Sequence, residues 1–203
     1  MARRSDHSRE EIREMALEAA ERLIAEQGSK ALSARKVATA IGYTVGTLYL
    51  VFENLDDLIL QVNARTLDRL HARMLEELAP LDDPMERVLQ LGHSYIGFAN
   101  DHPHHWELVF EHRLPPGKQP PQWFRDKVRR MFALVERELK PLAGNRDSQA
   151  ISRGAAALWS GVHGICILAI GGQLEVAGVD SVQSLTRSLM RNYLTGFRTN
   201  GSS

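Results

Sequence analysis

Residues 33–52 read SARKVATAIGYTVGTLYLVF, and this stretch decides the fold. Ser33 and Thr44 each precede a short helical pattern, and both are residue types that cap the N-terminus of a helix. Gly42 lies between the two patterns, where a tight turn needs a residue that tolerates a positive φ. The order of cap, short helix, glycine turn, second cap and second short helix predicts a helix-turn-helix.

The apolar positions of this stretch predict which side of the helix-turn-helix is buried. The small Ala38 allows the two helices to approach closely, and the other inward positions carry larger apolar groups. The residues expected to be buried are Val37, Ala38, Ile41, Leu48 and Phe52. A three-helix bundle with a purely structural role is the alternative interpretation of the same pattern.

The outward positions carry groups suited to a DNA surface. Around the second helix they are short or amphipathic, as a helix lying in a groove requires. These residues are Tyr43, Thr44, Val45, Gly46, Thr47 and Tyr49. At the start of the first short helix, Ser33, Arg35 and Lys36 combine backbone amides with positive charge, which predicts phosphate contacts.

The rest of the chain repeats the helical period without sustained alternation, which predicts an all-α protein. We expect the first helix to begin at Ser8 and to end at Gly28, and Asn54 to cap a long helix. This long helix would join an N-terminal three-helix domain, residues 1–55, to a larger helical domain, residues 56–203. Further helices are expected near residues 83–100, 104–112, 122–139, 148–171 and 181–198.

Residues 32–52 resemble the DNA-reading segment of the tetracycline-repressor family of bacterial regulators. The spacing of Gly46-Thr47-Leu48-Tyr49 and Phe52 is the most specific part, and the resemblance extends over residues 8–60. A second stretch, Trp159-Ser160-Gly161-Val162-His163-Gly164, resembles a Trp-x-x-x-His-Gly signature of one C-terminal branch of that family. Residues 102–106, HPHHW, resemble the segment that precedes the ligand pocket in that branch.

The resemblance implies a transcription regulator that binds double-stranded DNA. It implies that Thr44, Thr47 and Tyr49 contact phosphates or base edges, that Tyr43 and Val45 approach bases, and that Ser33 and Arg35 contact phosphates. Two positions depart from the family pattern: Val51 stands where members often have His, and Leu55 where they often have Lys. Each departure predicts a lost phosphate contact and a shallower salt dependence of binding. Arg3, Arg4 and Arg9 are candidates to compensate as an N-terminal arm.

The two last predicted helices are unusually apolar. We expect them to form a four-helix interface between two copies of the chain, so that a symmetric dimer presents two readers to a near-palindromic site. The alternative is that they close the core of a single chain. The apolar positions that suggest this are Ala155, Leu158, Trp159, Val162, Cys166, Ile167 and Ile170, then Val182, Leu185, Leu189, Tyr193, Leu194 and Phe197.

Aromatic and sulfur-containing residues with a few polar tips suit a small, largely apolar effector. The candidate pocket residues are His93, Tyr95, Trp106, Phe110, Phe124, Met131, Trp159 and His163. Each of them alone fits ordinary core equally well, and the cavity as such is implied by the family resemblance. The resulting hypothesis is a repressor that releases its operator when a small molecule binds.

Several other classes are disfavoured. The 25 basic and 25 acidic residues balance, so any basic surface is local. Cys166 is the single cysteine, and the longest uninterrupted apolar run, residues 165–170, is too short to cross a membrane. We therefore expect a cytoplasmic protein with no membrane partner.

The sequence offers no metal site or catalytic motif. Neither a metal nor a cofactor is expected, because the histidines lack a ligand spacing that converges on one ion: His102, His104, His105 and His112. No nucleophile, zinc or phosphate-loop motif supports an enzyme, and a carrier module without DNA binding is the remaining alternative.

Overall fold

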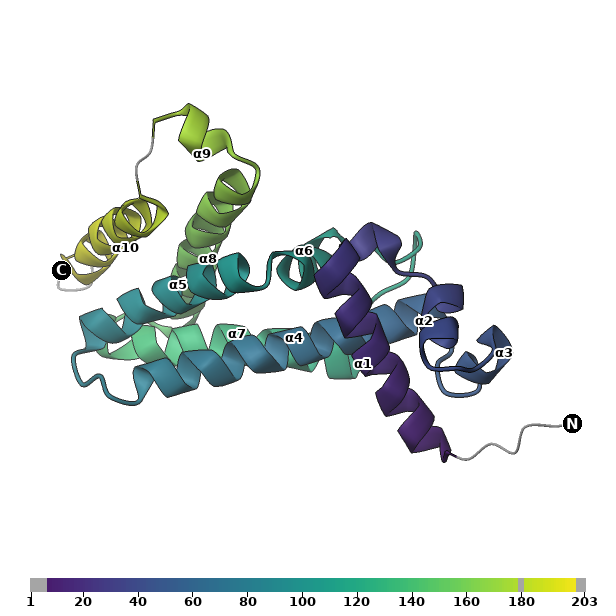
Figure 1. The fold of residues 1–203 in the computed structure, drawn as a ribbon. Helices are drawn as coiled ribbons and strands as arrows, with labels where there is room; N and C mark the ends of the chain where they lie inside the picture. Colours follow the sequence, from purple (N-terminus) through teal and green to yellow (C-terminus); the bar gives the residue numbers. More distant parts are fainter. Residues whose placement is uncertain (1–6, 179–180, 200–203) are drawn as a thin grey trace, which may run out of the picture. The chain divides into compact units, whose positions relative to one another are not determined.

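The computed structural model describes residues 7–178 and 181–199, which form helices and turns and contain no strand (Figure 1). This all-α architecture confirms the predicted fold class. The α-helices are α1 (Arg9–Gln27), α2 (Ala34–Ala40), α3 (Val45–Leu48), α4 (Leu55–Leu78), α5 (Pro84–Asp101), α6 (Pro103–Glu111), α7 (Gln122–Leu139), α8 (Ser148–Ile170), α9 (Gln173–Val176) and α10 (Val182–Thr199). Two short 3₁₀ turns, η1 (Ser29–Ala31) and η2 (Lys140–Leu142), complete them.

Capping side chains set the predicted helix starts. Ser8 and Glu11 form the reciprocal capping box of α1, because Ser8 Oγ accepts a hydrogen bond from the Glu11 amide while the Glu11 carboxylate accepts one from the Ser8 amide. Asn54 Oδ1 accepts from the Asp57 amide at the start of α4, and Asp83 caps α5 with Pro84 at its first position. These caps confirm the helix starts expected at residues 8, 54 and 83. The sequence argument missed the four-residue helix α9, whose length gives little periodicity.

Packing divides the chain into two compact units. One contains the residues up to Thr66 together with His104–Phe124, and the other contains Leu67–Pro103 together with the residues from Arg125 onward. Helix α4 contributes residues to both. Compactness does not test which residues bind DNA or an effector, so the division into 1–55 and 56–203 stays a prediction. The packing adds that α6 and the loop after it belong with the N-terminal unit.

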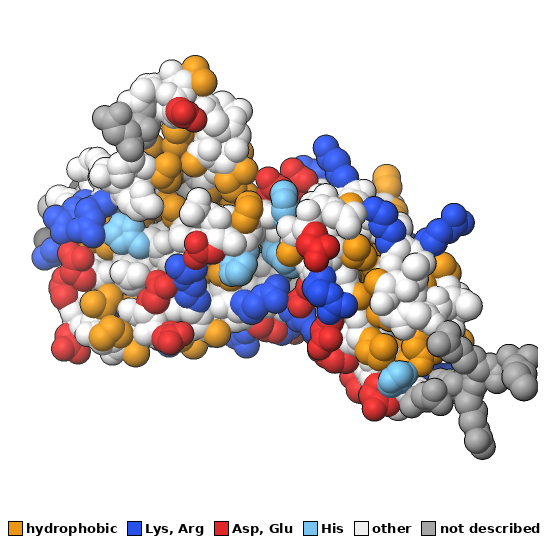
Figure 2. Space-filling view, viewed as in Figure 1, with side chains coloured by type: hydrophobic (Ala, Val, Ile, Leu, Met, Phe, Trp, Pro, Cys, Tyr) orange, Lys and Arg blue, Asp and Glu red, His pale blue; other side chains and the backbone are white. Residues whose placement is uncertain are grey.

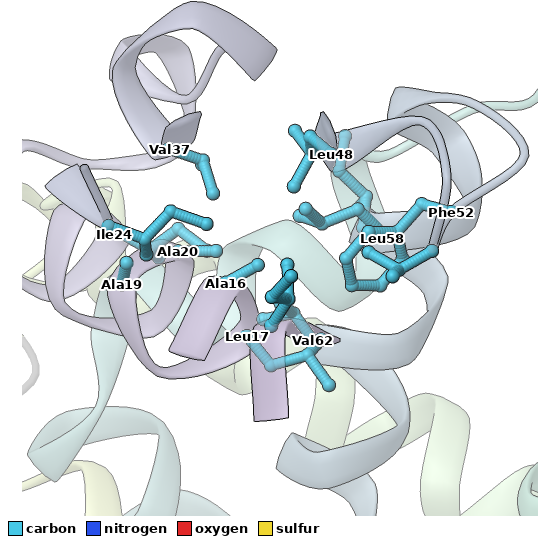
Figure 3. Close-up of a cluster of buried hydrophobic side chains, with 14 of the residues drawn as sticks. Ala16, Leu17, Ala19, Ala20, Ile24, Val37, Leu48, Phe52, Leu58 and Val62 are labelled. Atoms are coloured by element: carbon cyan, nitrogen blue, oxygen red, sulfur yellow. The ribbon is translucent and has the colours of Figure 1, made fainter. Parts of the chain in front are cut away.

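The core of the N-terminal unit joins α1, α2, α3 and the first part of α4. Figure 3 shows Ile24, Val37, Leu48, Phe52 and Leu58 pointing toward one another from these helices. Each of these side chains is almost completely buried, so together they hold the helix-turn-helix against α1 and α4. All five residues that the sequence placed inside the helix-turn-helix are buried.

The second unit packs α10 against both α5 and α8. Leu194 of α10 and Leu89 of α5 are fully buried in it. Glu138 is the buried charge of this unit, and it accepts a hydrogen bond from Arg87 Nε at 2.6 Å. Burial raises the pKa of Glu138, but the hydrogen bonds from Arg87 and Arg137 outweigh that effect and hold the pKa below its ordinary value. The carboxylate is therefore ionised and paired at neutral pH.

Candidate nucleic-acid interface and apolar cavity

The turn of the helix-turn-helix closes on its own backbone. Gly42 has φ +74°, the Tyr43 amide donates to the Ala38 carbonyl at 2.9 Å, and the Gly42 amide donates to the Thr39 carbonyl at 3.1 Å. This pattern is a Schellman motif, which ends a helix with a residue in the left-handed conformation. The sequence-predicted role of Gly42 is confirmed, and its conformation determines the direction in which the chain enters α3.

Replacing Gly42 with alanine is expected to destabilise the protein by about 1 kcal/mol, because a Cβ is unfavourable at this φ. No other atom lies within 4 Å of the added Cβ, so the cost is confined to the backbone. Urea unfolding measures it. The matched control is Gly46→Ala in α3, where the new Cβ would meet only Thr44 Oγ1 at 3.6 Å and stability should stay equal or rise. Equal losses in both variants would contradict this account of the turn.

Helix α3 begins at Thr44, whose hydroxyl oxygen accepts a hydrogen bond from the Thr47 amide at 3.1 Å. The two threonine hydroxyls are 3.0 Å apart and bonded to each other. Tyr49 follows α3 and is 46% exposed, as the sequence argument expected. Thr44 is exposed and Thr47 is partly exposed, so the candidate reading surface carries two hydroxyl groups and one phenol ring.

Other predicted DNA-contacting residues have specific surroundings. Tyr43 is half-buried against the core, and its hydroxyl lies 2.8 Å from His7 Nδ1, within hydrogen-bond distance. Ser33 Oγ caps α2 by accepting from the Lys36 amide at 3.3 Å, which leaves its own O–H free to donate to a phosphate. Arg35 is exposed on α2, while Lys36 Nζ donates to Gln27 Oε1 at 3.1 Å. The structure thus places a basic pair beside the capped start of α2.

Val51 and Leu55, the two departures from the family pattern, face the protein interior. Val51 is only 6% exposed and belongs to the same core cluster as Phe52. Leu55 is half-buried against that cluster. Both side chains therefore stabilise the attachment of α3 to α4. A change to His or Lys would have to turn the side chain out of the core before it reached a phosphate.

The predicted pocket residues fall into both compact units. Trp106, Phe110 and Phe124 lie in the N-terminal unit, where the rings of Trp106 and Phe110 are in contact at 4.9 Å between centroids. The second unit holds His93, Tyr95, Met131, Trp159 and His163. Within it, Tyr95, Trp159 and His163 come together, whereas His93 and Met131 are half-buried outside the lining of the cavity described next.

A small cavity of about 40 Å³ lies in the second unit, and its lining exposes only apolar surface. Tyr95 and Trp159 were predicted to line it. Leu158 and Val162, which the sequence suggested for the dimer interface, also line it and are buried within the chain. The sequence argument did not assign the other lining residues to a pocket: Met74, Val88, Leu91, Gly92, Val135 and Met190. On α5, positions 88, 91, 92 and 95 share one helix face, and this spacing was a usable signal. A larger hollow of about 370 Å³ lies among Ile96, Cys166, Val182 and their neighbours, away from the predicted residues.

A polar pair, Tyr95 and His163, lies beside the small cavity of about 40 Å³. The Tyr95 hydroxyl and His163 Nδ1 are 2.8 Å apart and hydrogen-bonded, and the imidazole stacks on Trp159 with 4.9 Å between ring centroids. Burial lowers the pKa of His163, which keeps the ring neutral at pH 7. A ligand in the cavity would meet apolar walls without a formal charge, while the Tyr95 and His163 polar atoms are bonded to each other outside the exposed lining.

Stability is expected to fall as the pH drops from 7.5 to 5. Burial lowers the pKa of His71, His93, His112 and His163 from the ordinary value of 6.5. The unfolded chain therefore binds more protons than the folded one below pH 6.5. The contribution of these histidines to the free energy of unfolding is complete above pH 6.5 and is lost as the pH falls. Carboxylates with a lowered pKa, such as Glu77 and Glu138, lose their contribution to stability only as the pH falls below the ordinary carboxylate pKa of 4.5.

Urea midpoints measured across this pH range test the prediction. His163→Gln removes one titrating group while keeping an amide beside Tyr95, so its midpoint should fall less than that of the parent. A parent midpoint that is constant or higher at pH 5.5 would contradict the prediction.

The outward face of α8 carries apolar and small residues, whereas the outward face of α10 is largely polar and includes Leu189 as its exposed large apolar side chain. Ile167 is 50% exposed and Leu168 44% exposed on α8, and Leu189 is 38% exposed on α10. Figure 2 shows apolar side chains gathered over α8. The exposed small positions are Ala156, Ala157, Ser160, Ser184 and Ser188. Small residues let two helices approach closely, so this face suits helix packing against another surface.

Helix α8 bears on the expectation about membrane spans. By length and composition it is apolar enough to cross a membrane. The sequence argument considered only the uninterrupted apolar run 165–170. It did not consider that the longer helix around this run is apolar on average although Gly and Ser lie within it. Core helices of globular proteins meet the same criterion, and α8 packs against α5 and α10.

A capped helix-turn-helix followed by an all-α body defines the class of DNA-binding transcription regulators. Two family descriptions match the chain: "Bacterial regulatory proteins, tetR family" over residues 16–62, and "Tetracyclin repressor-like, C-terminal domain" over residues 88–193. The second match alone covers more than half of the sequence. The chain therefore belongs to the tetracycline-repressor family. The Trp-x-x-x-His-Gly branch stays a prediction.

Solved structures share this fold. A protein of unknown function from Rhodococcus sp. RHA1 is similar, with a TM-score of 0.77 at 20% identity over 97% of this chain and 98% of that chain. A TetR-family transcriptional regulator from Streptomyces coelicolor gives a TM-score of 0.66 at 18% identity, covering 92% of this chain and 99% of that chain. RolR, solved in complex with resorcinol, gives 0.66 at 15% identity, covering 90% and 86%. No curated protein sequence matches the chain significantly.

Proposed function

We propose that this regulator is a cytoplasmic, homodimeric repressor that binds a near-palindromic operator and releases it when a small molecule binds. Residues 1–55 would form the DNA-binding domain, and residues 56–203 would bind the effector and form the dimer. We assign no metal, cofactor or enzymatic step to it. The proposed DNA-contacting residues are Ser33, Arg35, Lys36, Tyr43, Thr44, Val45, Gly46, Thr47 and Tyr49.

The surface of α3 carries the proposal. Thr44 and Thr47 hold their hydroxyls together at the protein surface, while Leu48 and Phe52 are buried. A hydroxyl donates to and accepts from base edges and phosphates, and it is short enough to let a helix enter the major groove. Tyr49 extends this surface with an exposed ring.

The exposed apolar face of α8, with Leu189 of α10, supports the dimer. A two-fold axis would place the same two helices of each copy against each other in a four-helix interface. Two linked readers bind one operator far more tightly than a single reader, because the second contact becomes intramolecular.

We take the small apolar cavity as the place where an uncharged effector enters, and the effector would have to widen it because about 40 Å³ is far below the size of a ligand pocket. Its lining includes Met74 of α4, and Leu58 and Val62 of the same helix belong to the core that holds the reader. A ligand that enlarged the cavity would displace α4 and so favour one arrangement of the readers over another. RolR was solved with resorcinol, a small aromatic molecule, and this similarity of fold motivates aromatic compounds as the first effectors to test.

Selection from random duplex DNA tests the function. The purified protein is incubated with a randomised duplex library, and the bound fragments are sequenced over several rounds. We expect enrichment of one near-palindromic sequence with two equivalent half-sites. Enrichment of no sequence would favour a carrier or interaction module. The selected operator then serves to screen small molecules for release, and failure of every compound to weaken binding would count against effector control.

A further inference from the structure

Leu50 is exposed at the end of the candidate reading surface. It is 63% exposed, more than any other large apolar side chain described in the N-terminal unit. A single exposed leucine is ordinary on a protein surface. The position of Leu50 is what distinguishes it, because it follows α3 directly and adjoins Tyr49.

Leu50 continues a row of residues spaced three apart. The Leu50 amide donates to the Thr47 carbonyl at 3.1 Å, and the Thr47 amide donates to the Thr44 hydroxyl at 3.1 Å. Residues three apart in such a backbone turn lie on the same face, which places Leu50 beside Thr47. The Thr44 and Thr47 hydroxyls are bonded to each other, so Thr44, Thr47 and Leu50 form one row, which we call the reading row.

Other side chains of the same turns are buried. Leu48, Val51 and Phe52 pack in the core. Val51 is therefore committed to the core, whereas Leu50 stays exposed beside Tyr49 at this end of the reader. The reading row thus offers two hydroxyls followed by one large apolar group.

The chemistry of the major groove selects a partner for that apolar group. A leucine side chain neither accepts nor donates a hydrogen bond, so it gains nothing from phosphates or from polar base edges. The thymine C5-methyl is the apolar group that base pairs present in the major groove. We propose that Leu50 determines specificity by packing against a thymine methyl at one fixed position in each half-site. This inference rests on the proposed DNA-reading function.

Deoxyuridine substitution tests the contact directly, because deoxyuridine pairs like thymidine and lacks only the methyl. Each thymine of the selected operator is replaced in turn, symmetrically in both half-sites, and binding of the parent is measured by fluorescence anisotropy. We expect one position at which affinity falls by about tenfold, since two methyl contacts are lost per dimer. Leu50→Ala should bind the thymine operator about as weakly and show no further loss at that position.

The control variant is Leu75→Ala, which truncates an exposed leucine of α4 and should keep the parent's full sensitivity to deoxyuridine. Thermal unfolding of Leu50→Ala should match the parent, because the side chain is exposed. If the parent and Leu50→Ala respond alike at every thymine, or if the operator has no thymine in its half-sites, the inference is wrong while DNA binding stands. If the selection yields no operator, the proposed function fails first and the inference fails with it.

Discussion

Thr47→Ala combined with Tyr49→Ala is expected to lower the affinity for the selected operator by about 100-fold or more, because two contacts are lost in each half-site of a dimer. Both side chains lie on the outward side of α3 and the turn after it, and Tyr49 is 46% exposed. Neither is needed for the core, which is formed by Leu48 and Phe52. The loss should therefore appear in DNA affinity, measured by anisotropy at fixed salt, and not in folding.

The design separates contact from stability. Thr44 is left intact because its hydroxyl caps α3, and its removal would weaken the helix itself. Thr39→Ala, an exposed threonine of α2 outside the proposed contact set, is the matched control and should bind like the parent. Circular dichroism should show equal helicity in all three proteins. If the double variant binds the operator as tightly as the parent, the assignment of the reader is wrong.

Ile167→Glu is expected to convert the proposed dimer into a monomer and to weaken operator binding by about 100-fold. Ile167 is half-exposed in a single chain, on the α8 face that we assign to the interface. A two-fold axis places the substituted residue of each copy in the same interface, so two carboxylates would be desolvated in an apolar contact. Analytical ultracentrifugation measures the mass, and anisotropy measures the affinity.

The control for this variant is Leu75→Glu. Leu75 is an exposed leucine of α4, so it introduces the same charge outside the proposed interface. It should remain dimeric and bind DNA like the parent. A parent that sediments as a monomer, or an Ile167→Glu variant that dimerises as tightly as the parent, would rule out the α8 and α10 interface.

Local signals predicted the reader well. The caps at Ser8, Ser33, Thr44 and Asp83 each act on an amide three residues away, so the residues that decide them are adjacent in sequence. The same holds for Gly42, since the conformation of a turn depends on the residue at its centre. Burial of Leu48 and Phe52 followed from helical spacing alone.

Local sequence signals could not show which of the predicted pocket residues lie together in the structure. Helical periodicity shows that one face of a helix is apolar, but it does not show which other face packs against it. Trp106 and Phe110 looked like companions of Tyr95 and Trp159 by composition, yet they belong to a different compact unit. The partners of Tyr95 and Trp159 are aliphatic residues of α4, α5, α7, α8 and α10, which no aromatic signal marks.

The sequence by itself determined the all-α class and the helix-turn-helix at residues 33–52, because caps, a glycine turn and helical spacing are local. Its resemblance to the tetracycline-repressor family indicated the family. Only the tertiary structure decided that Val51 faces the core while Leu50 stays exposed, and that residues 104–124 pack with the N-terminal unit. The reason is physical: burial depends on contacts between segments distant in sequence, and the free energy of those contacts is shared among many side chains. The reading row and the small cavity are products of that packing.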